Sequence, residues 1–313
     1  MNYVGFDIGK KSIRFIQNNE IQAEETVCLA YNAQNKIIAS GNKALSFYGT
    51  RRLKFDLTLK ELFILMDTMM ERFHVFRLFQ KTSIIFTLPS TYSDQEIDKI
   101  KTYFYHRGAN QVIYETENLC AALGSHLNIT ADCSACLFHI GYSQSTLTLF
   151  RSNQILKEEH LNYGSQHINL QIKNWIQSTY HFQVSDQAIE EIKTKIGQCQ
   201  KVAVPRKIRI PGTDFTSQQL KYLELNENQM VALLQPFIYL WSKWIYTFLS
   251  ELNQFQQEEI LHRGITACGP TLKIDHLLDS LQEQLSLPFY LALNASECTA
   301  EGLAIRIEQE QKK

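Results

Sequence analysis

Residues 3–16 read YVGFDIGKKSIRFI, and this stretch decides the fold, with apolar residues on both sides of Gly9. Glycine permits a tight turn, so the stretch predicts a strand, a turn and a returning strand. The same pattern recurs at residues 135–150, which read ACLFHIGYSQSTLTLF and turn at Gly141. The recurrence predicts an internal duplication, with two related α/β domains facing each other across a ligand cleft.

The composition is that of a globular protein with a substantial core. The 313 residues are 44% apolar and 20% charged, which excludes a disordered chain. Lys and Arg number 31 against 32 Asp and Glu, so we expect no broad basic surface for nucleic acid. Seven scattered cysteines, and a first segment that lacks the features of a signal peptide, predict a reducing, cytoplasmic setting.

The first half of the chain predicts a parallel strand–helix–strand unit. The capping-box pattern Ser/Thr-x-x-Glu occurs at residues 58–61 and 93–96, and each occurrence predicts the start of a helix. Gly108 is suited to end the second of these helices. Strands are expected at residues 25–31, 36–40, 83–88 and 112–114, and a short helix at 117–123.

The second half contains a long apolar stretch at residues 230–249 with a single charge. Pro236, Ser242 and Lys243 lie within it, where a bilayer would disfavour them, so it is interpreted as a buried helix of a soluble protein. Isoleucine stripes predict two more helices. The remaining expected elements are helices at 168–176, 189–196 and 299–307, and strands at 202–210, 261–266 and 289–293.

Taken together, these segments resemble the bacterial actin-like proteins of the MreB and FtsA type, and MreB most of all. Residues 3–14 resemble the first phosphate loop of that family, and residues 139–141 stand where its second loop belongs. ETENLCAALG at 115–124 resembles its Glu-Pro-x-Ala-Ala-Ala-x-Gly segment. EEIKTKIG at 190–197 resembles its adenosine-side helix, and ILHRGITACG at 260–269 resembles the strand and glycine-rich turn under the nucleotide.

The resemblance implies an α/β fold of the actin-like ATPase type. Two duplicated ribonuclease H-like domains would surround a central cleft for ATP and Mg²⁺. Domain I would cover residues 1–130, with a small subdomain inserted at about 25–75. Domain II would cover residues 131–295, with an insertion at about 180–255, and residues 296–313 would form a helix that returns to domain I.

The resemblance also implies roles for individual residues. Asp7 would serve the metal, and Glu117 would orient the attacking water. Gly164 would begin a helix beside the nucleotide, while Glu190 and Lys193 would face the ribose or base. The residues implied to bind the cofactor are Gly9, Lys10, Lys11, Ser12, Gly141, Ser143, Gly164, Glu190, Lys193 and Gly269.

Several positions depart from the family pattern. His139 stands where the second phosphate loop of the family has Asp, and histidine is a poor ligand for the hard Mg²⁺ ion. Tyr142 follows in a loop that must touch phosphate, and Ala267 and Cys268 replace two glycines of the late turn. These changes predict that ATP is bound weakly or not at all and that hydrolysis is weak or lost. The sequence therefore does not decide whether the chain is an enzyme.

The favoured interpretation is an MreB-like cytoskeletal protein with a role in cell shape. Its partners would be further copies of itself or other actin-like and cell-envelope proteins, and the inner face of the membrane is a further option. One alternative is a non-polymerising adaptor resembling FtsA or PilM, which GSQHIN at residues 164–169 suggests. The other is an active ATPase of the sugar-kinase or chaperone type, against which His139 counts.

A CxxC motif and a small basic cluster each have a structural interpretation that is favoured over a functional one. Cys133 and Cys136 form a CxxC without a second pair at zinc-site spacing, so two buried apolar cysteines are favoured over a metal or redox site. Arg51, Arg52 and Lys54 form a small basic cluster, for which a solvated loop is the default and anionic lipid or a partner the minor alternative.

Overall fold

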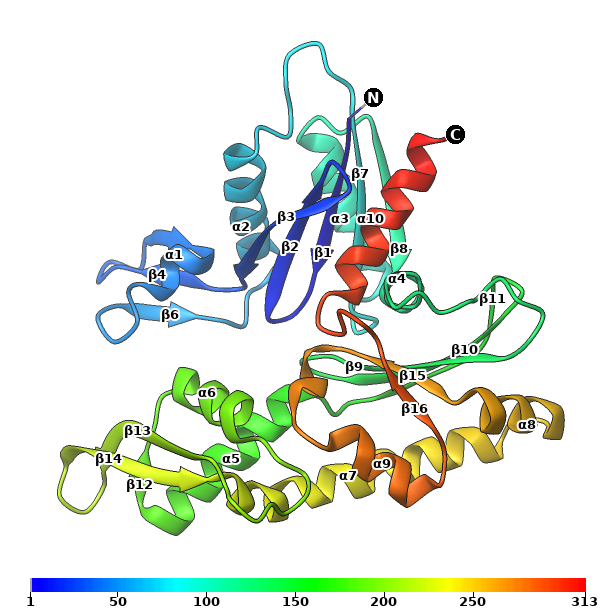
Figure 1. Ribbon diagram of the computed structural model, residues 1–313. Helices are drawn as coiled ribbons and strands as arrows, with labels where there is room; N and C mark the ends of the chain where they lie inside the picture. The colour runs from blue at the N-terminus through cyan, green and yellow to red at the C-terminus, as the bar shows by residue number, and fades with distance from the viewer. Residues whose placement is uncertain (1) are drawn as a thin grey trace. The chain divides into compact units, whose positions relative to one another are not determined.

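The computed structural model describes residues 2–313, whose elements fall into two compact units (Figure 1). Unit 1 holds the chain up to His126 together with Glu297–Lys313, and unit 2 holds Leu127–Ser296. The boundaries predicted from the sequence lie after residues 130 and 295. Each unit contains one five-stranded and one three-stranded sheet.

The main sheet of unit 1 has the strand order β3-β2-β1-β7-β8. Its strand β1 pairs antiparallel with β2 and parallel with β7, so β1 is bonded along both edges. Helices cover both faces of this sheet, which explains why β1 and β7 are nearly continuous apolar runs. The strands are β1 (Asn2–Ile8), β2 (Ser12–Gln17), β3 (Glu20–Thr26), β7 (Thr82–Leu88) and β8 (Gln111–Thr116).

On one face of this sheet, α2 (Leu59–Arg72) and α3 (Asp94–His106) pack into a core rich in phenylalanine. On the other face lie α4 (Glu117–Gly124) and α10 (Cys298–Gln311). Figure 1 shows α10 in red beside β1 and β8. The two helices cross with their backbones close together. A Cβ at Gly302 would overlap the carbonyl oxygen of Cys120, and one at Gly124 would overlap that of Cys298.

The small sheet of unit 1 has the order β5-β4-β6 and is completed by the short helix α1 (Gly41–Leu45). Its strands are β4 (Leu29–Tyr31), β5 (Ile37–Ser40) and β6 (Arg52–Lys54). Part of the basic cluster has partners here, because Arg52 stacks 4.7 Å from the centre of the Tyr31 ring and Lys54 binds Glu61 at 2.7 Å.

The main sheet of unit 2 repeats the topology of unit 1, with the order β11-β10-β9-β15-β16. The two central hairpins close in the same way: the Gly9 N–H donates to the Ser12 carbonyl at 2.9 Å, and the Gly141 N–H donates to the Gln144 carbonyl at 2.9 Å. This equivalence confirms the predicted duplication. The strands are β9 (Ala135–Ile140), β10 (Ser145–Arg151), β11 (Gln154–Leu161), β15 (Ile265–Cys268) and β16 (Phe289–Leu291).

The predicted buried helix of unit 2 is α7 (Glu227–Ser250), whose Trp241 is fully enclosed in the core. No helix within residues 2–313 has the length and apolar character needed to cross a membrane. The small sheet has the order β12-β13-β14. The other elements are α5 (Ser165–Tyr180), β12 (Phe182–Gln183), α6 (Asp186–Ile196), β13 (Lys207–Asp214), β14 (Gln219–Asn226), α8 (Gln254–Arg263), the 3₁₀ turn η1 (Pro270–Lys273) and α9 (Leu277–Leu285).

The structure corrects three expectations. Residues 202–206 are not a strand, since β13 begins only at Lys207 and Val204 is 87% exposed. Residues 261–263 belong to α8, which ends at Gly264 in the left-handed region with φ +71°, and β15 begins after it. Cys133 is half-buried where a buried cysteine was expected, although Cys136 is buried and both are free thiols.

Both predicted capping boxes are present, and the one at Thr58 extends into a small charged network. Glu61 accepts hydrogen bonds from Lys54 Nζ, the Thr58 N–H and the Tyr31 hydroxyl. These bonds, led by that from Lys54, lower the pKa of Glu61 from 4.5 to about 2. The carboxylate therefore stabilises unit 1 at neutral pH.

We expect Glu61→Gln to lower the free energy of unfolding by about 1 kcal/mol at pH 7. A lowered folded-state pKa contributes stability that is fully present above pH 4.5 and is lost as the pH falls towards 2. Urea unfolding at pH 7 and near pH 2 should thus show the difference between wild type and variant shrinking. Glu71→Gln, an exposed change on the same helix, is the control. A difference that is independent of pH would contradict this account.

Candidate functional site

The candidate residues lie at the carboxyl ends of the parallel strands, the edge at which open α/β sheets bind ligands. In unit 1, β1 ends at Ile8 and leads into the hairpin tip Lys10-Lys11. In unit 2, β9 ends at Ile140 and leads into the tip Tyr142-Ser143. Within residues 2–313, no acceptor takes the backbone N–H of Lys10 or of Ser143, so each tip keeps one donor available for an anion.

Asp7 is buried and paired. It lies opposite Arg14 in the β1–β2 register, and Arg14 Nη1 is 3.2 Å from Asp7 Oδ2. Burial raises the pKa of Asp7 more than the guanidinium of Arg14 lowers it. Burial lowers the pKa of Arg14, but the carboxylates of Asp7 and Glu24 raise it further, and the net shift is upward. Asp7 would be costly to ionise here without Arg14 beside it.

As held in this structure, Asp7 does not fit direct coordination of Mg²⁺. The guanidinium of Arg14 donates to one oxygen of this carboxylate, Oδ2, and its charge would repel a dication brought to Asp7. At the equivalent position of unit 2 stands His139, which is buried and offers nitrogen where Mg²⁺ prefers oxygen. Across residues 2–313 no three His, Cys, Asp or Glu side chains gather as a metal site. The metal role that the resemblance implies for Asp7 stays a prediction, and it would require Arg14 to move away.

The remaining unit 1 residues lie around the same edge. The Lys10 ammonium sits 4.0 Å above the ring of Tyr92, on the loop that precedes α3. Lys11 is exposed and Ser12 begins β2. Glu117 is half-buried at the first position of α4, directly after β8. Because β1, β7 and β8 run parallel, with Asp7, Thr87 and Glu115 side by side in register, Glu117 lies at the same sheet edge as Asp7.

In unit 2, the second hairpin tip is fixed to the start of α5. The N–H groups of Ser165 and Gln166 donate to the carbonyls of Gly141 and Tyr142 at 3.1 and 2.9 Å. Gly164 is needed for this approach, since a Cβ there would meet the Tyr142 carbonyl oxygen at 2.6 Å. The tip and the helix terminus therefore form one rigid element.

A polar network joins α5 to α6 beside that element. Lys193 is only 4% exposed, and its ammonium donates to the Ser165 hydroxyl and, at 2.9 Å, to Glu190 Oε2. Asn169 Nδ2 donates to the same carboxylate oxygen at 3.0 Å. Lys193 is thus a buried charge with its partners in place, and Glu190 remains partly exposed with a carboxylate oriented from two sides.

Two further residues complete the unit 2 cluster. Gly269 has φ +112°, and a Cβ there would overlap the carbonyl oxygen of Ile140, so the late turn is pressed against the end of β9. Burial raises the pKa of Tyr142, and the negative charges of Glu190 and Asp186 raise it further. The Tyr142 phenol is therefore protonated at neutral pH and lies in the electrostatic reach of Glu190.

The structure thus brings together the implied unit 2 residues Gly141, Ser143, Gly164, Glu190, Lys193 and Gly269 at one sheet edge. Sequence reasoning missed three residues that shape the two clusters. Arg14 could have been found, because hairpin register places it opposite Asp7. Ser165 and Asn169 carry no motif, and only the packing of α5 on α6 shows their role.

We expect Gly269→Ala to destabilise unit 2 by more than about 2 kcal/mol, because the position lies in a glycine-only backbone region and the new methyl group would overlap Ile140. Gly49→Ala is the control. Gly49 has φ +75° with open space around its Cβ, so that change should cost only about 1 kcal/mol of backbone strain. Chemical denaturation of the two variants measures the difference, and equal losses would show that the contact with Ile140 is unimportant.

The comparisons with known proteins agree with this architecture. The family model described as MreB/Mbl protein matches residues 1–313. The cell shape-determining protein Mbl of Bacillus subtilis (strain 168) is 21% identical over 99% of this chain and 96% of its own length. The cell shape-determining protein MreB of Pasteurella multocida is 20% identical over 70% of this chain and 63% of its own length.

Solved structures show the same fold. The crystal structure of MreB5 of Spiroplasma citri bound to AMPPNP has a TM-score of 0.91 at 21% identity and covers 99% of this chain and 97% of that one. The double helical filament of MamK has a TM-score of 0.80 at 10% identity, with 98% of both chains covered. The chain therefore belongs to the MreB/Mbl family, the bacterial actin homologues of the cell-shape cytoskeleton.

Proposed function

We propose that this chain binds ATP or ADP as a conformational ligand, hydrolyses ATP weakly or not at all, and assembles with copies of itself in a cell-shape cytoskeleton. The observation that carries the proposal is the unit 2 cluster, where a hairpin tip, the start of α5, the Glu190–Lys193 pair and the Gly269 turn lie at one sheet edge. The AMPPNP-bound and ADP-bound structures of MreB5 from Spiroplasma citri support it.

The chemistry of the cluster suits a nucleoside. A partly exposed carboxylate, as at Glu190, accepts hydrogen bonds from ribose hydroxyls, and Lys193 and Asn169 orient it for that purpose. The unpaired N–H of Ser143 suits a phosphate oxygen. The proposal keeps two roles that the family resemblance implies. The Gly9–Ser12 turn would bind phosphate, and Glu117 would orient the attacking water.

Weak hydrolysis follows from the charges at the two strand ends. Phosphoryl transfer depends on positioned cations and carboxylates. Here Arg14 holds Asp7, and His139 supplies no carboxylate at the equivalent place in unit 2. The chain's own groups can bind and orient a nucleotide, while the end of β9 offers the His139 imidazole in place of the family's acidic residue.

We expect millimolar ATP to raise the melting temperature by about 5 °C, since a ligand at one hundred times its Kd adds about 2.7 kcal/mol. Glu190→Gln should abolish most of the shift, whereas Glu191→Gln, the next residue on α6, should keep it. The shift should also persist in EDTA, because Arg14 supplies the positive charge at Asp7. Differential scanning fluorimetry, phosphate release and pelleting of the same samples test these expectations.

Each alternative predicts a different result. Rapid Mg²⁺-dependent phosphate release that Asp7→Asn abolishes would mean an active ATPase. Absence of a shift with either nucleotide, together with no sedimentable polymer, would favour a non-polymerising adaptor. A thermal shift that Glu190→Gln and Glu191→Gln affect equally would remove the unit 2 cluster as the binding site.

An exposed apolar loop in unit 1 also favours peripheral contact with the inner face of the membrane. The loop between α2 and β7 projects beyond both elements (Figure 1). It carries Leu78, which is 84% exposed, and Phe79, which is fully exposed with φ +64°. Arg77 and Lys81 flank them, so the loop pairs an apolar tip with two cations, as suits an anionic bilayer surface.

We expect the double variant Leu78→Ser and Phe79→Ser to lose binding to phosphatidylglycerol-containing vesicles by at least about tenfold, because burying each side chain contributes about 2 kcal/mol. Leu220→Ser is the control, since Leu220 is 85% exposed on β14 in unit 2. Vesicle co-sedimentation measures the effect, and raised salt should weaken binding through Arg77 and Lys81. Equal binding by both variants would show that this loop is not the membrane contact.

A further inference from the structure

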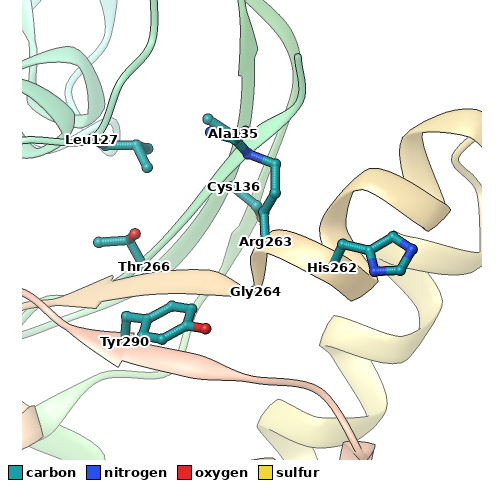
Figure 2. A pocket seen from close by; sticks show the side chains of 8 residues that line it. All are labelled: Leu127, Ala135, Cys136, His262, Arg263, Gly264, Thr266 and Tyr290. Carbon is teal, nitrogen blue, oxygen red and sulfur yellow. The ribbon is translucent and has the colours of Figure 1, made fainter. Parts of the chain in front are cut away.

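A second cavity lies in unit 2 at the opposite end of the strands from the nucleotide cluster. It has a volume of about 390 Å³ and is built by the last turn of α8, the first residues of β9 and β15, and β16 (Figure 2). β9 enters this cavity at Ala135 and reaches the nucleotide cluster only after Ile140. At about 3.3 Å per residue the strand separates the two places by more than 15 Å.

Hydrogen-bond donors without acceptors gather in this cavity. Figure 2 shows the Arg263 side chain turning from the end of α8 towards Ala135 and Cys136, with the Thr266 and Tyr290 side chains beneath it. Within residues 2–313, no side chain or carbonyl accepts from the Arg263 guanidinium, and the hydroxyls of Thr266 and Tyr290 have no hydrogen bond either. By contrast, Arg14, Arg151 and Arg306 each bind carboxylates of their own unit.

The backbone holds these donors in place. Gly264 has φ +71°, and a Cβ there would lie 2.6 Å from both the Pro288 carbonyl oxygen and the Tyr290 ring. The glycine therefore lets the end of α8 approach β16 closely. Any larger residue at 264 would open this corner of the cavity.

The rest of the lining beside Arg263 includes an apolar, uncharged surface. Leu127 and Ala135 line it, together with Cys136, whose pKa burial raises to about 12, so its thiol is neutral. No acidic side chain lines the cavity within the described chain. His262 also lines the cavity, and Figure 2 shows its ring turned away from Ala135 and Thr266. A ligand entering between these residues would meet the permanent positive charge of Arg263, two hydroxyls and a hydrocarbon surface.

We propose that this cavity binds a carboxylate carried on a short apolar body. One guanidinium matches one carboxylate through two parallel hydrogen bonds, and Thr266 and Tyr290 can donate to its remaining lone pairs. A phosphate dianion would keep one charge uncompensated, because Arg263 is the one permanently charged cation among the lining residues. The volume suits a small ligand, and the wall of Leu127 and Ala135 covers its hydrocarbon part. Such a group could be a free short-chain acid or the carboxyl-terminal residue of a polypeptide.

The test uses the full chain and calorimetry with four probes of similar size. N-acetyl-leucine represents a polypeptide terminus, hexanoate a free acid, N-acetyl-leucinamide an uncharged control and hexyl phosphate a dianion. We expect saturable binding of the two carboxylates, with the tighter one identifying the source, and binding of the amide and the phosphate weaker by at least about tenfold.

Arg263→Gln should weaken carboxylate binding by a similar factor, while Arg209→Gln should leave it unchanged. Arg209 stacks on Tyr222 in β13 and β14, away from the cavity, and matches Arg263 in charge. Both arginines are exposed, so both variants should fold, which their melting temperatures will show. No saturable carboxylate binding, equal binding of the amide, tighter binding of the phosphate, or an unchanged affinity in Arg263→Gln would each overturn the proposal.

Discussion

The structure depends on one arrangement used twice, a central strand that is bonded antiparallel on one edge and parallel on the other. β1 and β9 are both paired along their two edges in this way, and both are largely buried on their two faces. The buried middle of each strand is mostly apolar, and a buried polar side chain stands one residue before its carboxyl end. Asp7 and His139 occupy that point in the two units, and both are buried.

The two units use this shared frame differently. In unit 1 the strand end carries a buried ion pair, Asp7 with Arg14, beside an open and basic hairpin tip. In unit 2 the strand end carries His139, and the charged pair has moved to the helices as Glu190 with Lys193. The two units therefore share a sheet topology but not the side chains at the strand ends, because the residues at equivalent positions differ in charge.

Local signals in the sequence were sufficient for much of this fold. The capping boxes at Thr58 and Ser93 act within four residues, and both form as predicted. The edge strand β11 was missed, and β3 was predicted only from Glu25 onward, because polar and charged residues interrupt both strands and no apolar run marks them. Within the site, glycines at 164 and 269 were identifiable, whereas the partners of Glu190 come from another helix and depend on packing that no short motif records.

The close crossing of α4 and α10 has a consequence for how the chain matures. Leu303 and Ile307 of α10 fill the core of unit 1, yet they are made only after all of unit 2. On the ribosome, unit 2 is a continuous segment that can finish folding first, while the sheet of unit 1 waits with one face uncovered. The glycines at 124 and 302 then admit the late helix without rearrangement of the backbone. Vectorial synthesis thus completes the amino-terminal unit last.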